Sequence, residues 1–175
     1  MNIQRLYQYT PQGLVELENK GATVDPALKD LLEKNLATLL SVRPIASDVR
    51  VTPPFGGTVD TLGLDPDNRP VVVVYQSSPD DGTINRGVYY LDWLRRQPQV
   101  FDGLNGVQAD GGTPQRVGRR VPRLVCIASF FSPFDVFAVE LFERDIDLVT
   151  YRYFGDEYLM LEIVASHQGE PPVRP

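Results

Sequence analysis

The feature that most constrains the fold is the stretch Gly57–Gln76, which has the pattern of two strands joined by a polar turn. The turn, Asp65-Pro66-Asp67-Asn68, combines side chains that bond to nearby backbone with a proline that fixes φ. The strand after it, Val71–Tyr75, has apolar residues on both faces, which is typical of a central strand. The strand before it carries a single acid, Asp60. Because a buried carboxylate is costly without a partner or ligand, Asp60 is the first candidate functional residue.

An acid on one strand of a hairpin, followed by a Glu-x-Lys type position on the next, resembles the pattern of PD-(D/E)XK nucleases. The surrounding sequence is similar to one branch of that superfamily, whose members resemble the catalytic domain of prokaryotic DNA endonucleases. The similarity extends from about Leu6 to Ile163. The segments that carry it are Leu32–Leu36, Val59–Asp65, Gly87–Leu94 and Pro122–Ala128.

The resemblance implies a restriction-endonuclease-like α/β fold, with a mixed central sheet flanked by helices and an N-terminal β-hairpin. It also implies catalytic positions at Glu33, Asp60 and Gln76 and a metal position at Asp60. The chain departs from the family at the site itself. Val74 stands where the family has its metal-binding Glu, Gln76 stands where it has its catalytic Lys, and Arg86 replaces a Gln at the start of the next helix.

These departures matter because phosphodiester cleavage of this type needs hard oxygen ligands around Mg²⁺ or Mn²⁺. Asp60 and the missing Glu would form the core of that ligand set, together with a backbone carbonyl from the same strand. Replacing Glu by Val removes a charge and a ligand at once. The expectation is a vestigial site with no cofactor, or with Mg²⁺ or Mn²⁺ if the protein is active.

Glu33 belongs to a helix expected to begin at Asp25-Pro26, an N-cap residue followed by proline at the first position. The leucines of this helix recur at helical spacing and form one apolar face, with Glu33 at its rim. Two interpretations stay open: a solvated helix acid, or an acid that leans over the sheet toward Asp60.

The charge of the chain argues against a generally basic surface for nucleic acid, since the formal net charge is −6. Four arginines are nevertheless candidates for phosphate contact: Arg86, Arg116, Arg119 and Arg120. The last three end a stretch expected to be irregular, from Phe101 to Arg120, and a plain solvated loop is the favoured interpretation there.

A length of 175 residues predicts one domain, taken as residues 1–166, with a proline-rich flexible tail at 167–175. Cys126 is expected to be buried, and one Cys with one His excludes a Cys/His zinc cluster. No signal peptide or membrane span is visible, so a cytoplasmic protein without membrane association is expected.

Three functions compete at this stage. The first is a catalytically inactive nuclease-like domain that binds nucleic acid, a protein partner or a second copy of itself. The second is an active metal-dependent DNA endonuclease in which Glu33, Asp80 or Asp81 replaces the lost ligand. The third is a structural subunit of a larger protein assembly.

Overall fold

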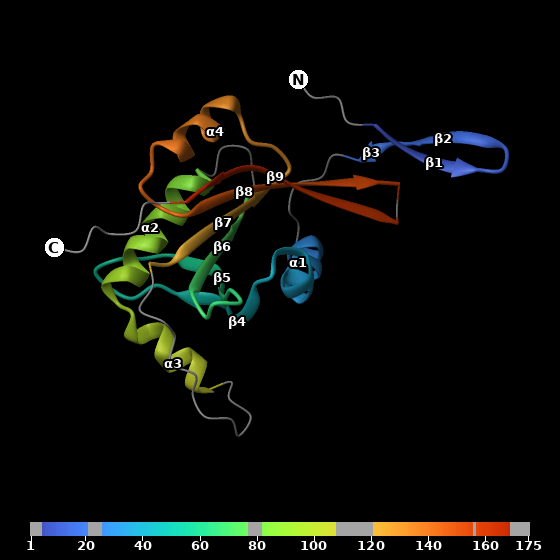
Figure 1. The fold of residues 1–175 in the computed structure, drawn as a ribbon. Coiled ribbons are helices and arrows are strands. Elements are labelled where there is room, and N and C mark those ends of the chain that lie inside the picture. The colour runs from blue at the N-terminus through green and yellow to red at the C-terminus, as the bar shows by residue number, and fades with distance from the viewer. Residues whose placement is uncertain (1–4, 21–25, 77–81, 108–120, 156, 169–175) are drawn as a thin grey trace.

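The computed structural model describes residues 5–20, 26–76, 82–107, 121–155 and 157–168. They form a two-stranded hairpin and a seven-stranded mixed sheet flanked by helices on both faces (Figure 1). The strands are β1 (Leu6–Thr10), β2 (Gly13–Leu17), β3 (Asn19–Lys20), β4 (Arg43–Arg50), β5 (Thr58–Leu64), β6 (Pro70–Tyr75), β7 (Arg123–Ala128), β8 (Ile146–Phe154) and β9 (Tyr158–His167). The helices are α1 (Pro26–Leu40), α2 (Thr83–Arg96), α3 (Gln99–Val107) and α4 (Pro133–Glu140).

The main sheet has the order β3-β8-β7-β6-β5-β4, and β9 pairs with β8. Strand β7 is parallel to both of its neighbours, β6 and β8. The other pairs, β3–β8, β4–β5, β5–β6 and β8–β9, are antiparallel. The prediction of a mixed α/β sheet with an N-terminal hairpin is therefore confirmed.

Strand β6 is central, as its apolar sequence predicts, and all six of its residues are buried. The turn before it is built as expected, because the Asp65 carboxylate accepts hydrogen bonds from the backbone N–H groups of Asp67 and Arg69. Asn68 takes the left-handed conformation there, at φ 57°.

Alternate residues of β6 serve two separate cores. Val71, Val73 and Tyr75 pack on the face covered by α1. Val72 and Val74 pack on the other face, among side chains of α2, α3 and α4. A strand buried on both faces lies at the centre of the molecule, and its carboxyl end is where polar residues from both sides can meet.

The helix starts follow the sequence signals where the structure describes them. Helix α1 begins at Pro26, and α4 begins with Ser132 as the N-cap of a full capping box with Asp135. Helix α2 begins after Gly82, which is left-handed at φ 60°.

The structure differs from the sequence predictions in two elements. Part of the stretch predicted to be irregular is helix α3, and Phe101 within it is only 1% exposed. His167, expected to begin a flexible tail, instead ends β9 and pairs with Ile146 of β8. The physical cause is the same in both, because tertiary burial and strand pairing stabilise segments whose local sequence is a weak signal.

Candidate functional site

The candidate site lies where β5 and β6 separate. Their pairing runs from Leu64↔Pro70 to Thr61↔Val73 and stops there. At the next position Asp60 accepts a hydrogen bond from the backbone N–H of Tyr75, at 3.0 Å from its Oδ2 atom. The carboxylate thus takes the place of a ladder hydrogen bond. We call this point, formed by Asp60 and the backbone of Tyr75, the β5–β6 fork.

Arg86 of α2 reaches into the fork from the opposite side of the sheet to α1. Its Nη2 donates to the backbone carbonyl of Tyr75 at 2.6 Å and lies 3.4 Å from Asp60 Oδ2. Gly87 makes this reach possible, because a Cβ there would lie 2.6 Å from Leu124 Cδ1. The missing side chain lets α2 approach β7 closely, which brings the neighbouring arginine to the end of β6.

A second cation comes from α1. Lys29 Nζ lies 3.9 Å from Asp60 Oδ1 and donates a 2.6 Å hydrogen bond to Asp48 of β4. Asp60 is therefore the meeting point of charges from both layers of helices. The sequence gives one signal for Lys29, which precedes Glu33 by four residues and so shares its side of α1.

Burial and the charges around Asp60 act on its pKa in opposite directions. Burial raises the pKa of its carboxyl above the ordinary value of 3.8, and the nearby Asp48 adds to that. The Tyr75 N–H, Arg86 and Lys29 act in the opposite direction without overcoming the effect of burial. Arg86 and Lys29 therefore offset part, and not all, of the effect of burial on the Asp60 carboxyl.

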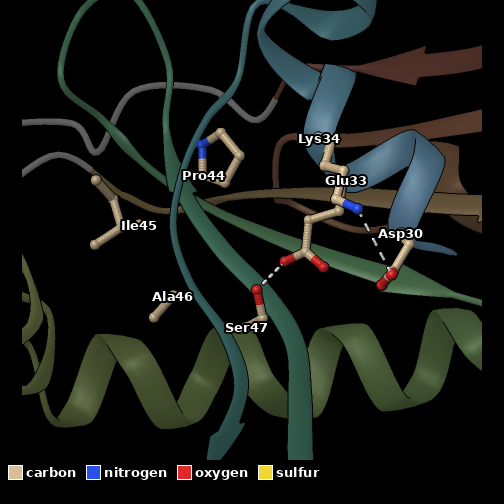
Figure 2. Close-up of a pocket in the computed structure, with 7 residues that line it drawn as sticks. All are labelled: Asp30, Glu33, Lys34, Pro44, Ile45, Ala46 and Ser47. Atoms are coloured by element: carbon tan, nitrogen blue, oxygen red, sulfur yellow. Dashed lines mark hydrogen bonds and ion pairs between the residues drawn. The ribbon is translucent and has the colours of Figure 1, made fainter.

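Glu33 leans over the sheet, and its hydrogen-bond partners there are two hydroxyls. Its Oε1 accepts hydrogen bonds from the hydroxyls of Ser47 on β4 and Thr61 on β5, the latter at 3.0 Å. Figure 2 shows Glu33 extending from α1 toward Ser47, beside Pro44, Ala46 and the Lys34–Asp30 pair, which line a shallow depression. Glu33 is thus held by hydroxyls on the α1 face of the sheet.

The Tyr75 side chain is buried near Glu33. Burial raises the pKa of its phenol, the Thr61 hydroxyl opposes that shift, and the charges of Glu33 and Asp60 add to it. The Tyr75 hydroxyl has no hydrogen-bond partner of suitable geometry among the described residues. The phenol is accordingly neutral at physiological pH.

The two substituted positions of β6 lie in different surroundings. Val74 is fully buried in the apolar core beneath α2. Gln76 follows the strand and lines a depression between the start of α2 and α4, together with Thr83, Phe131 and Ala138. The structure therefore brings Asp60 and Arg86 together, places Glu33 on hydroxyls nearby, and gives Val74 a purely apolar environment.

Five candidates lie outside the described residues. They are Arg116, Arg119 and Arg120, proposed for phosphate, and Asp80 and Asp81, proposed as replacement ligands. Within the described part of the chain, no group of three or more His, Cys, Asp or Glu side chains is placed to hold a metal ion. Sequence reasoning missed the internal role of Arg86, which was assigned to phosphate.

Comparison with protein-family models, with curated proteins and with solved structures gave no match to this chain. Across the described residues, no helix is both long enough and apolar enough to span a membrane.

Proposed function

We propose that this chain is a PD-(D/E)XK-like domain that has exchanged its catalytic metal for an internal arginine and works by binding a protein partner. One observation carries the proposal: Arg86 Nη2 lies between Asp60 Oδ2 and the Tyr75 carbonyl, at 3.4 and 2.6 Å. A carboxylate of the hairpin and a carbonyl of the following strand are the ligands that the family resemblance implies for the metal. Here the same two groups bind a guanidinium.

The guanidinium disfavours a metal ion at this place for two reasons. Its positive charge repels a divalent cation, and it already uses the oxygen atoms that the cation would need. Mg²⁺ further demands near-octahedral oxygen coordination, to which Val74 contributes nothing. Metal binding requires the deprotonated carboxyl, and burial, which raises the pKa of Asp60, makes the proton a stronger competitor there than at an exposed aspartate.

The order of elements supports a restriction-endonuclease-like architecture as part of this proposal. One helix, α1, precedes a three-stranded antiparallel unit, β4 to β6, and α2 then leads to β7, which pairs in parallel with β6. Asp60 occupies the point where the hairpin opens, and Glu33 comes from the preceding helix. Fold alone does not fix function, so the argument for lost chemistry rests on the fork.

A protein partner is favoured over nucleic acid by the state of Arg86. Its side chain is 29% exposed and already hydrogen-bonded to the protein, so a phosphate would have to displace Asp60. The net charge of −6 is also unfavourable for binding a polyanion. In contrast, several large apolar side chains are exposed on α4 and on the hairpin. Such surfaces mark interaction sites when they are contiguous.

The proposal is tested by a cleavage assay with labelled single- and double-stranded DNA in Mn²⁺, with the native protein and the Asp60→Ala variant side by side. We expect both proteins to leave the DNA at its uncatalysed level. Cleavage by the native protein that Asp60→Ala abolishes would instead establish an active endonuclease with a replacement ligand.

Binding to the same DNA over a salt series tests the choice of partner. We expect no specific retention at physiological salt. Affinity that falls steeply as salt rises would show phosphate contacts, because each neutralised phosphate releases counterions on binding. That result would replace the protein partner by a nucleic acid while leaving the loss of metal chemistry intact.

A further inference from the structure

Helix α4 is apolar on two sides, although only one side has a core to pack against. Val139 is fully buried, and Val136 and Phe142 pack against the same core. A second set of apolar residues points outward, with exposed fractions of 85% for Phe134, 61% for Phe137 and 71% for Leu141. Their spacing of three and four residues places them on one face of the helix. We call Phe134, Phe137 and Leu141 the α4 stripe.

The size of this surface is that of the largest apolar patch on a typical monomer. Phe130, just before the helix, is also 66% exposed. With aromatic side chains that bury about 150–250 Å² each, the stripe and Phe130 expose on the order of 500 Å². Contiguous apolar patches on monomers are commonly about 300–600 Å² at most and are often functional at that size. The stripe therefore has the area of a docking surface.

The hairpin of β1 and β2 is the second surface on which large apolar side chains are exposed among the described residues. All of its strand residues are exposed except Thr10 and Leu17, which are partly buried. Cross-strand pairing puts Tyr7, Tyr9 and Leu14 on one of its faces, with Glu16, which pairs with Arg5, at the end of that face. An isolated two-stranded hairpin is marginally stable in water unless it packs on something else. We call residues Leu6–Leu17 the arm.

The arm and the α4 stripe cannot satisfy each other within one chain. Figure 1 shows the arm extending away from the main sheet, while α4 covers the opposite end of the sheet, beside β9. The arm is a separate two-stranded sheet that shares no strand pairing with the main one. Two exposed apolar surfaces at opposite ends of one molecule are the arrangement from which a reciprocal dimer can be built.

We propose that a second copy of this chain is the occupant: the arm of each copy packs its Tyr7, Tyr9 and Leu14 face on the α4 stripe of the other. A strand of the arm is long enough to span the α4 stripe. Five strand residues extend about 17 Å, whereas Phe134 to Leu141 extends about 10 Å along the helix. Two such contacts, each burying on the order of 500 Å² per side, give about 2,000 Å² in total. That is within the range of stable protein interfaces.

The test is sedimentation velocity over a dilution series of the full chain, which does not depend on the function proposed above. One variant carries Tyr9→Asp and Leu14→Asp in the arm, and the other carries Phe134→Asp and Phe137→Asp in α4. We expect the native chain to dimerise and each variant to weaken the dimer by about 30-fold or more, as charge in a central apolar contact does. Leu31→Glu, at a leucine of α1 that is 45% exposed and lies outside both surfaces, is the control and leaves the dimer intact.

Mixing the two variants distinguishes pairing of the arm with the α4 stripe from any other dimer interface. The arm variant retains an intact α4 stripe and the α4 variant retains an intact arm, so the mixture can form one of the two contacts. We expect a heterodimer that neither variant forms alone, with far-UV circular dichroism showing that both are folded. A monomeric native chain, a dimer that survives either pair of substitutions, or a mixture that stays monomeric would overturn the proposal.

Discussion

Two arginine–aspartate pairs sit in the same sheet and differ in how tightly they are closed. At one, Arg123 of β7 binds Asp147 of β8 through both Nε, at 2.6 Å, and Nη2. Ser166 donates to the other carboxylate oxygen at 2.5 Å, and Asp147 is 6% exposed. At the other, Arg86 approaches Asp60 with one nitrogen at 3.4 Å, and the Asp60 side chain is 22% exposed.

The difference separates a closed structural pair from the open pair at the proposed site. Every oxygen of Asp147 has a short partner, so its charge is fully compensated between two strands. Asp60 lies at a strand separation, open to a second cation from α1, and burial raises its pKa. The looser pair is the one at the position implied for catalysis, which is where an incompletely compensated charge is expected.

The largest effect is expected at the closed pair. Asp147→Ala leaves the Arg123 guanidinium without its partner and should lower the free energy of unfolding by about 3 kcal/mol, measured by urea denaturation. Asp92→Ala is the control, because Asp92 pairs with Arg95 and Arg96 on the solvent side of α2. Its expected cost is at most about 0.5 kcal/mol. Equal losses for the two variants would contradict the contrast between closed and exposed pairs.

A smaller effect is expected when the internal cation is removed. Arg86→Gln loses a charge-assisted hydrogen bond to the Tyr75 carbonyl and should destabilise the protein by about 1.5 kcal/mol. It should also raise the pKa of Asp60 further, because Arg86 is one of the groups that lower it. Arg86→Lys, which keeps the charge, should shift the pKa less. Carboxyl carbon chemical shifts over a pH titration measure the pKa of Asp60 in each variant. An Asp60 pKa that is unchanged in Arg86→Gln would contradict the interaction between Arg86 and Asp60.

The smallest effect is expected for Asp60→Asn, which keeps an oxygen for the Tyr75 N–H and should change stability by about 1 kcal/mol or less at neutral pH. The informative quantity is its pH dependence. Because the folded-state pKa of Asp60 is raised, the folded protein binds the proton more tightly than the unfolded chain. The native protein should therefore gain stability relative to Asp60→Asn as the pH falls through that pKa, and level off below 3.8. Denaturation over a pH series checks this, and a relative loss on acidification would have the wrong sign.

Much of the fold could be predicted because local and global signals agree. The turn before β6, the apolar run of β6 itself, and the starts of α1 and α4 are all visible in the sequence and are all present. Helix α3 was missed because Gly103, Asn105 and Gly106 have low helix propensity. The burial of Phe101 stabilises it, together with Val100 and Leu104, which pack against the same core.

The site was harder to predict, since it depends on contacts between distant segments. Periodicity placed Arg86 near the polar side of its helix, but it could not show that the close approach of α2 at Gly87 aims that side chain at Asp60. The hydrogen-bond partners of Glu33 could not be predicted either, because Ser47 and Thr61 belong to two strands that are distant from α1 in the sequence. Nor could the pattern of α4 distinguish its inward apolar side from its exposed one, because both have helical spacing.

The central claim is that Arg86 has taken the place of a metal ion, and the most direct test is a titration with Mn²⁺ in which the electron paramagnetic resonance signal reports the free ion. The triple variant Arg86→Gln, Val74→Glu and Gln76→Lys, which restores the family pattern, should bind Mn²⁺ and lower that signal. The native protein should leave the signal unchanged. Mn²⁺ binding by the native protein that Asp60→Asn abolishes would show a working metal site and contradict the account.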